Sequence, residues 1–215
     1  MAELPIVQFN EVAGCKDSVA SQCALLFGLA KVAESRDDDT GQHLTRIKTY
    51  TKIIAALYAE QFPKRLHQSM VGVISETSIV HDIGKVGIAD DILRHAGPYS
   101  ESQFETMKTH TTIGADILLA LADQFGRDAW IDTAMQIALS HHERFDGSGY
   151  PFGLCGETIS LPARLVSIAD VYDALCSNRV YKEAFSHEEA MDLINDETGM
   201  QFDPEIALLL KNNHK

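Results

Sequence analysis

The residues best suited to chemistry in this chain are histidines and aspartates that occur in adjacent pairs. His81 is followed directly by Asp82 after an apolar run, and His141 is followed directly by His142. A carboxylate after an apolar run is expected to be buried, which is unfavourable unless it is paired or binds a metal ion. Neighbouring residues of a helix point about 100° apart, so such a pair serves two ions more easily than one. We therefore interpret Asp82 as a carboxylate that bridges two metal ions.

Further histidines and aspartates of the same kind recur along the chain. The metal ligands predicted in this way are His43, His81, Asp82, His110, His141, His142 and Asp170. Most of the gaps between them are roughly thirty residues, which matches one helix out and one helix back, so each return can bring a ligand to one region. Imidazole and carboxylate ligands without a thiolate favour Fe, Mn or similar ions over a structural zinc. Two ions ~3.5–4 Å apart suit phosphoester hydrolysis.

Basic side chains near these ligands are candidates for phosphate binding. They are Lys85, Arg144, Arg179 and Lys182. The first comes one helical turn after His81, the second follows the double histidine, and the last two end the helix that carries Asp170. The alternative for each is a solvated surface charge, which contributes little to stability. Tyr150 could stack on a base or line the pocket, or it could be a turn aromatic that covers the core.

Helices must position these residues, because no segment shows the sustained alternation of polar and apolar residues that is typical of a strand. The predicted helices cover about residues 18–32, 40–63, 66–81, 100–110, 114–125, 128–142, 163–177, 186–195 and 204–210. Glycine, proline and aspartate are dense at residues 146–153, which predicts a turn-rich loop. We expect an all-α fold with room for one short β-ribbon near residues 153–160.

Composition limits the class of protein. The 215 residues suit one domain over residues 17–215, with residues 1–16 as a leader or the stub of a linker. A net charge of -13 argues against a protein that binds duplex nucleic acid, because such a protein needs a basic face. The four cysteines form no CxxC pair and are interpreted as free thiols of a reducing compartment. Neither a signal peptide nor an apolar run of ~18 residues is evident, so a cytoplasmic protein without a membrane span is expected.

Four runs together resemble the HD-GYP domains of bacteria, a branch of the HD phosphohydrolase superfamily. These runs are residues 81–85 (His-Asp-Ile-Gly-Lys), 141–144 (His-His-Glu-Arg), 146–151 (Asp-Gly-Ser-Gly-Tyr-Pro) and 170–175 (Asp-Val-Tyr-Asp-Ala-Leu). An HD dipeptide alone is weak support, whereas the extended run from His141 through Pro151 is highly specific. The resemblance covers most of the chain, from about Glu34 to Pro204.

The resemblance implies a helical bundle of the HD superfamily that hydrolyses cyclic di-GMP to pGpG, and in some members onward to GMP. It implies the same seven metal ligands that the spacing predicts, with Asp82 and Lys85 as the catalytic residues. Asp173, one turn after Asp170, is implied to be a buried partner of this network. The substrate contacts implied by the matching motifs are Asp37, Lys85, Gly149, Tyr150, Arg179 and Lys182.

Two departures from the family pattern affect these expectations. Family members with three metal ions carry the pattern Glu-Thr-Gly-x-His, in which the glutamate is an additional metal ligand. Asp39 stands in place of that glutamate here and is one methylene shorter, so two ions are the expected number and Asp39 is the less certain ligand. The family's usual run Arg-Pro-Tyr-Lys is replaced by Arg-Val-Tyr-Lys at residues 179–182 of this chain. Both cationic side chains, Arg179 and Lys182, are kept.

Two alternatives remain at this point. The chain could hydrolyse another cyclic dinucleotide such as cyclic GMP-AMP, because residues that bind phosphate do not define the base. It could instead be a non-catalytic module that binds a cyclic dinucleotide or docks signalling proteins through the loop around Tyr150. The full ligand set disfavours the second alternative, since a binding module does not need so many buried metal-type ligands.

Overall fold

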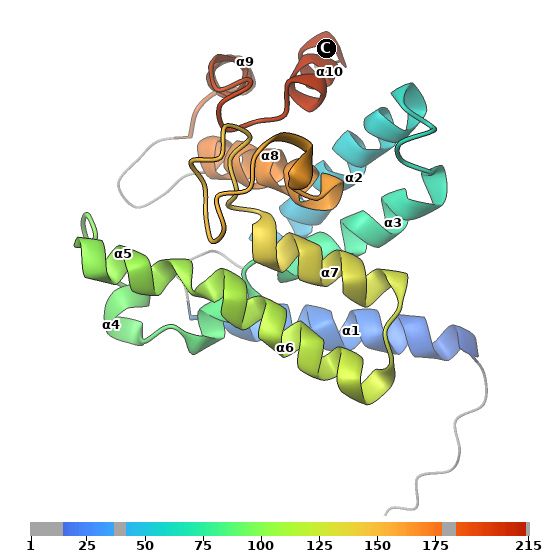
Figure 1. Cartoon of the computed structure of the whole chain (residues 1–215), viewed down its shortest axis with the longest axis vertical. Helices are drawn as coiled ribbons and strands as arrows, with labels where there is room; N and C mark the ends of the chain where they lie inside the picture. Colours follow the sequence, from blue (N-terminus) through green and yellow to red (C-terminus); the bar gives the residue numbers. More distant parts are fainter. Residues whose placement is uncertain (1–14, 37–41, 178–183, 214–215) are drawn as a thin grey trace, which may run out of the picture.

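The computed structural model of the protein describes residues 15–36, 42–177 and 184–213, with side chains from residue 24 onward. These residues form a bundle of α-helices joined by short 3₁₀ segments (Figure 1). The α-helices are α1 (Cys15–Glu34), α2 (His43–Gln61), α3 (Gln68–Thr77), α4 (Asp90–Leu93), α5 (Glu101–Lys108), α6 (His110–Phe125), α7 (Ala129–Ser140), α8 (Leu161–Cys176), α9 (His187–Asp196) and α10 (Pro204–Asn213). The 3₁₀ helices are η1 (Ser78–Val80), η2 (Ile83–Gly87) and η3 (Gly156–Thr158). The predicted all-α fold is confirmed.

Local capping explains why several helices begin where the sequence predicts. Ser186 and Glu189 form the predicted capping box of α9, in which each side chain bonds the backbone amide of the other residue. Asp128 caps α7 by accepting a hydrogen bond from the amide of Ile131 at 2.8 Å. Pro162 lies in the first turn of α8, where its missing amide hydrogen is not needed. The cap predicted for the second helix, Thr40, lies outside the described residues.

Three predictions about element boundaries are wrong. The helix predicted to reach His81 ends at Thr77 and continues as η1, and the helix predicted through His110 is interrupted at Thr109. The β-ribbon predicted near residues 153–160 is absent, and this segment holds η3 instead. Its glycines explain the difference, because Gly153 and Gly156 take φ values of +66° and +57°. This left-handed conformation interrupts an extended strand.

Two hydrophobic clusters of buried residues build the core. The first is formed mainly by α2, α3, α8, α9 and α10, with Tyr58 and Ile168 fully buried. The second is formed mainly by α1, η1, α6 and α7, with Leu118 and Val80 fully buried. The predicted ligands come from elements of both clusters, so the packing of the two halves sets their relative positions. None of the described helices is both long and apolar enough to span a membrane.

A buried ion pair ties α8 to the residue before α10. Arg164 is 8% exposed and Asp203 is 4% exposed, and the guanidinium of Arg164 pairs with the carboxylate. Arg164 Nε also donates a hydrogen bond to the carbonyl oxygen of Ile159 at 3.0 Å. Removal of one partner from such a pair leaves an uncompensated buried charge.

We expect Arg164→Met to lower the free energy of unfolding by roughly 3–5 kcal/mol, because Asp203 loses its buried partner. Urea denaturation followed by circular dichroism measures this change. Arg127→Met is the matched control, since its pair with Asp132 lies at the surface with the Arg127 side chain 65% exposed. Equal losses in the two variants would contradict the prediction.

Candidate metal centre

The ends of helices deliver almost all of the predicted metal ligands. His43 is the first residue of α2, His110 is the first residue of α6, and His141 directly follows α7. His81 and Asp82 lie between η1 and η2, where the chain leaves the helical path. Of the predicted ligands that the structure describes, Asp170 alone comes from the middle of a helix, α8.

The structure brings these residues together in two groups. The ligand atoms within each group lie within 4.8 Å of one another. The first group is Asp82, His110, His141 and His142, and the second is His43, His81 and Asp170. The seven residues predicted from spacing thus lie in two groups, and each group contains imidazole and carboxylate side chains.

The carboxylate of Asp82 lies between the two groups. Its Oδ1 is 3.3 Å from Nε2 of His110 and 3.6 Å from Nε2 of His141. Its Oδ2 is 3.3 Å from Nε2 of His81, which belongs to the second group. Nε2 of His81 is in turn 3.8 Å from Oδ1 of Asp170. One oxygen of Asp82 therefore faces each group, as a bridging ligand requires.

Backbone carbonyls hold three of the histidines in one tautomer. Nδ1 of His81 lies 2.9 Å from the carbonyl oxygen of Ser78, and Nδ1 of His110 lies 2.7 Å from that of Met107. Nδ1 of His141 lies 3.0 Å from the carbonyl oxygen of Ile137. A carbonyl oxygen only accepts hydrogen bonds, so each Nδ1 must donate. Nε2 then presents its lone pair to the cluster, which is the usual support of a metal-binding histidine.

The atoms that converge at the cluster fit a bound cation. Nε2 of His81, His110 and His141 and Oδ1 of Asp82 are buried and make no hydrogen bond with any described residue. A buried polar atom without a partner costs about 1–3 kcal/mol, and these four atoms lie close together. One metal ion at each of the two groups would together satisfy all of them, whereas no side chain in the described part of the chain does so.

Charges within the cluster separate the pKa values of its members. Burial alone would raise the pKa of Asp82, but the positive charges of Lys85 and His81 hold it well below its usual value. Burial lowers the pKa of His81, but the charge of Asp82 outweighs it and raises this pKa to about 9. Burial lowers the pKa of His110 to about 4 and also lowers the pKa of His142. Without metal, neutral His110 and His142 are ready to bind an ion, whereas His81 must release a proton first.

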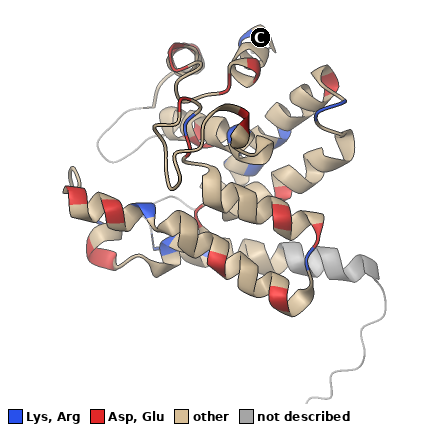
Figure 2. Cartoon of the chain, in the orientation of Figure 1, with Lys and Arg blue, Asp and Glu red and all other residues tan. Residues whose placement is uncertain are grey.

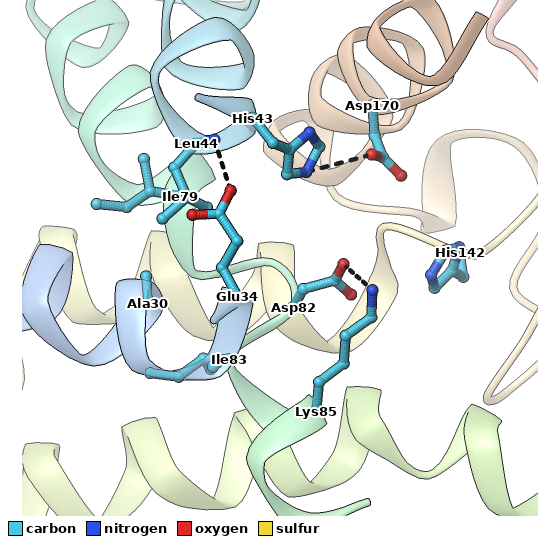
Figure 3. A pocket seen from close by; sticks show the side chains of 11 residues that line it. Ala30, Glu34, His43, Leu44, Ile79, Asp82, Ile83, Lys85, His142 and Asp170 are labelled. Atoms are coloured by element: carbon cyan, nitrogen blue, oxygen red, sulfur yellow. Dashed lines mark hydrogen bonds and ion pairs between the residues drawn. The ribbon is translucent and has the colours of Figure 1, made fainter. Parts of the chain in front are cut away.

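A cavity of about 220 Å³ opens beside these ligands (Figure 3). Its polar wall includes Asp82, Lys85, His142 and Asp170, and its apolar wall includes Leu44. Nζ of Lys85 lies 2.9 Å from Oδ2 of Asp82, so the predicted phosphate-binding ammonium stands at the cluster. An anionic group that enters the cavity could therefore contact the predicted ligands and the ammonium of Lys85.

The loop after α7 forms an aromatic edge of the site. The ring of Tyr150 stacks on that of His142 with centroids 4.8 Å apart, and Phe104 meets Tyr150 edge-on at 5.9 Å. Buried Glu143 holds the loop, because its carboxylate accepts hydrogen bonds from the amides of Phe152 at 2.8 Å and Leu154 at 3.0 Å. Tyr150 thus stands where a base could stack.

Close packing of the loop explains why residue 149 is a glycine. A Cβ at this position would lie 2.2 Å from the amide nitrogen of Arg144. The loop therefore approaches itself too closely for any side chain here. The substrate contact implied for Gly149 stays a prediction.

Arg144 serves as an anchor of the same loop. Its guanidinium donates to Ser148 Oγ at 3.0 Å, to Gln201 Oε1 at 2.9 Å and to Glu197 Oε2 at 2.7 Å. These contacts connect the loop to the segment between α9 and α10. The predicted substrate contact of Arg144 stays a prediction.

Four other predicted site residues lie outside the described residues. They are Asp37, Asp39, Arg179 and Lys182. The third-ion ligand and three of the predicted substrate contacts therefore remain predictions.

Sequence reasoning missed several residues that position the ligands. Arg36 donates to the carbonyl oxygens of Lys85 at 3.1 Å and Ile88 at 2.7 Å, so it fixes the segment that carries Lys85. Glu34 accepts a hydrogen bond from the amide of Leu44 at 3.3 Å and so satisfies the first turn of α2, where His43 lies. Neither contact leaves a signal in the sequence, because the sequence alone does not define how the two elements that each contact joins lie relative to one another.

Two further positioning residues had a detectable signal. Asp173 is buried as predicted, and His43 Nδ1 donates to its Oδ2 at 2.7 Å. Burial alone would raise the pKa of Asp173, but hydrogen bonds from His43 and Arg46 lower it. Arg46 lies three residues after His43, a spacing that places both side chains on one helix face. That spacing could have identified Arg46.

Gly84 sets the distance between η2 and α6. A Cβ at Gly84 would lie 1.9 Å from the carbonyl oxygen of His110 and 2.4 Å from the amide nitrogen of Gly114. Because α6 begins at His110, this close approach also sets the position of His110 relative to Asp82.

We expect Gly84→Ala to lower the free energy of unfolding by about 1–3 kcal/mol through overpacking and to weaken Mn(II) binding by displacing His110. Urea denaturation and Mn(II) titration measure the two effects. Gly72→Ala in α3 is the control, because a Cβ there meets nothing within 4 Å. It should raise stability by roughly 0.5–1 kcal/mol and leave Mn(II) binding unchanged. Similar behaviour of the two variants would contradict the prediction.

We also expect Mn(II) to raise the midpoint of thermal unfolding of the metal-free protein. An ion that binds the folded state alone stabilises it by about 2.7 kcal/mol at a hundredfold excess over its dissociation constant. Differential scanning calorimetry before and after chelation with EDTA measures the shift, and Asp82→Asn should reduce it. An unchanged midpoint with Mn(II) and with Fe(II) would argue against a metal centre.

Comparison with known proteins identifies the family of this chain. The HD domain family model matches residues 29–206. A cyclic di-GMP phosphodiesterase of Vibrio cholerae is 40% identical over 200 residues, which cover 92% of this chain and 39% of that protein. A 3'3'-cGAMP-specific phosphodiesterase of the same organism is 34% identical over 186 residues, which cover 86% of this chain and 34% of that protein. The chain thus spans less than half the length of these curated relatives.

A solved structure shares the fold. The crystal structure of a cyclic GMP-AMP specific phosphodiesterase from Vibrio cholerae superposes with a TM-score of 0.62 at 19% identity. The match covers 89% of this chain and 48% of that chain. The bundle, the adjacent ligand groups and the family match agree with the HD-GYP motifs, and the chain belongs to the HD domain family.

Proposed function

We propose that this chain is a metal-dependent phosphodiesterase that hydrolyses cyclic di-GMP to pGpG and can proceed to GMP. The observation that carries the proposal is the position of Asp82, which directs one carboxylate oxygen to each ligand group beside Lys85. A relative 40% identical to this chain is a cyclic di-GMP phosphodiesterase, which supports the choice of substrate. Bacterial second-messenger signalling, a cytoplasmic location and docking of signalling proteins through the loop around Tyr150 belong to the same proposal.

The proposed cofactors are two divalent ions, one for each ligand group, with Fe or Mn favoured. His110, His141, His142 and Asp82 would hold one ion, and His43, His81 and Asp170 would hold the other, with Asp82 shared. Imidazole with carboxylate and no thiolate is the ligand chemistry that these ions accept. When bound, two adjacent ions supply a nucleophile from water at neutral pH and stabilise the attacking and leaving oxygens.

The side chains around the cluster have distinct parts in this reaction. The ammonium of Lys85 stands at the cavity, where it neutralises charge that develops on the phosphate. The stacked rings of His142 and Tyr150 offer a surface for a base beside the phosphate position. Lys and Arg positions are scattered among Asp and Glu positions in the described part of the chain (Figure 2). Recognition of the anionic substrate therefore depends on a few placed cations and the bound ions rather than on a broad basic face.

A product assay tests the proposal. Protein loaded anaerobically with Fe(II) or Mn(II) is incubated with cyclic di-GMP, and the nucleotides are resolved by chromatography. We expect pGpG or GMP, with the rate lowered at least ~100-fold in Asp82→Asn, because several kcal/mol of transition-state stabilisation depends on the metals. Asp192→Asn, an exposed aspartate of α9, is the control and should retain the full rate.

Two other outcomes would replace this proposal. Cleavage of cyclic GMP-AMP in preference to cyclic di-GMP would assign the activity named for the 34% identical relative. Tight binding of a cyclic dinucleotide without any product, unchanged by Asp82→Asn in metal-loaded protein, would indicate a binding module.

A further inference from the structure

His43 differs from three other histidines of the cluster in what supports its Nδ1. Among the described contacts, His110 and His141 are supported at Nδ1 by neutral backbone carbonyls, and so is His81. His43 is supported by a carboxylate, because its Nδ1 donates to Oδ2 of Asp173 at 2.7 Å. A carboxylate that accepts from Nδ1 fixes the tautomer and the orientation of a metal-binding imidazole. The His43 group therefore depends on the position of Asp173.

Asp173 is itself fixed by a second residue of α2. Arg46 Nε lies 2.5 Å from Oδ1 of Asp173, and Arg46 Nη2 lies 3.0 Å from Oδ2. The side chain of Asp173 is 3% exposed, so water offers little competition for these bonds. The planar fork of arginine matches the two oxygens of a carboxylate and sets its plane as well as its position. His43 and Arg46 stand on the same face of α2, and both face Asp173 on α8.

We propose that Arg46 is a positioning residue that fixes the Asp173 carboxylate and thereby aims His43 at the ion of the His43, His81 and Asp170 group. The inference rests on the proposed metal-dependent function. Asp82 is shared by the two ion sites, whereas Arg46 and Asp173 are connected to the His43, His81 and Asp170 group through His43. Loss of Arg46 should therefore weaken one ion site and spare the other.

The chemistry of the contact explains why Arg46 matters for binding rather than only for folding. Without the guanidinium, the buried Asp173 carboxylate keeps only the described contact with His43 and can rotate about its side-chain bonds. The His43 ring then loses its fixed orientation, although α2 and α8 still pack through the apolar contacts of the first core cluster. Changes to such supporting residues typically lower metal affinity roughly 10- to 100-fold.

The test measures metal binding without turnover. Wild-type protein and Arg46→Met are titrated with Mn(II), and bound ions are counted by mass spectrometry and observed by electron paramagnetic resonance. We expect wild type to bind two ions with the spectrum of a spin-coupled pair. Arg46→Met should bind one ion with unchanged affinity and the second roughly 10- to 100-fold more weakly. At intermediate Mn(II) it should show the resolved hyperfine lines of an isolated ion.

A double-mutant cycle tests whether Arg46 acts through Asp173. Asp173→Asn should weaken the same ion site, and the double variant should be no weaker than Asp173→Asn alone. Arg46→Lys keeps the charge but not the fork, so an intermediate loss is expected. It also serves as the test variant if Arg46→Met does not fold.

Arg65→Met is the matched control, because Arg65 also pairs with carboxylates, those of Glu157 and Glu205. It follows the far end of α2, about 27 Å along the helix from His43 at 1.5 Å per residue. It should leave both affinities unchanged. Additive losses in the double-mutant cycle, equal loss of both ions in folded Arg46→Met, or no loss at all would overturn the proposal. If no cyclic dinucleotide is cleaved but two ions bind with this pattern, the proposed function fails and the role of Arg46 stands.

Discussion

Four buried polar atoms that converge without hydrogen bonds are the constraint on which this structure depends. Three histidine nitrogens and one oxygen of Asp82 lie together out of contact with water. Such an arrangement is unfavourable for the polypeptide alone, because each buried polar atom has lost its contact with water and gained no hydrogen-bond partner. The fold tolerates it because the surrounding helices are held by two large apolar clusters, and a bound cation would relieve it.

The placement of ligands at helix ends follows from the same constraint. A residue in the middle of a helix can direct one side chain to a site, whereas a chain that leaves a helix can direct two neighbours to different ions. His81 and Asp82 occupy such a break between η1 and η2. Backbone carbonyls of Ser78, Met107 and Ile137, each three or four residues before a histidine, orient the rings of His81, His110 and His141. The ends of helices thus supply both the predicted ligands and these supports.

The histidines of the centre are held by different means. His81, His110 and His141 are oriented by backbone carbonyls, and the close contact of η2 with α6 sets the position of His110. His43 is oriented by the side chain of Asp173, which pairs with Arg46 and joins α2 to α8. A backbone carbonyl stays in place when its own side chain is replaced, whereas the side-chain support of His43 is removed by a single substitution at Asp173 or Arg46.

The sequence by itself determined the helical class and most helix starts, and it predicted the seven described residues that converge in the two groups, because caps, periodicity and residue spacing are local properties. It also determined the family through the extended HD-GYP run. Only the tertiary structure decided which oxygen of Asp82 faces which group, that Glu143 and Arg144 anchor the loop of Tyr150, and that residues 153–160 form no ribbon. These features depend on contacts between distant segments, such as Arg46 with Asp173. A distant contact leaves no periodic signal, because the path of the intervening chain is set by packing of the whole core.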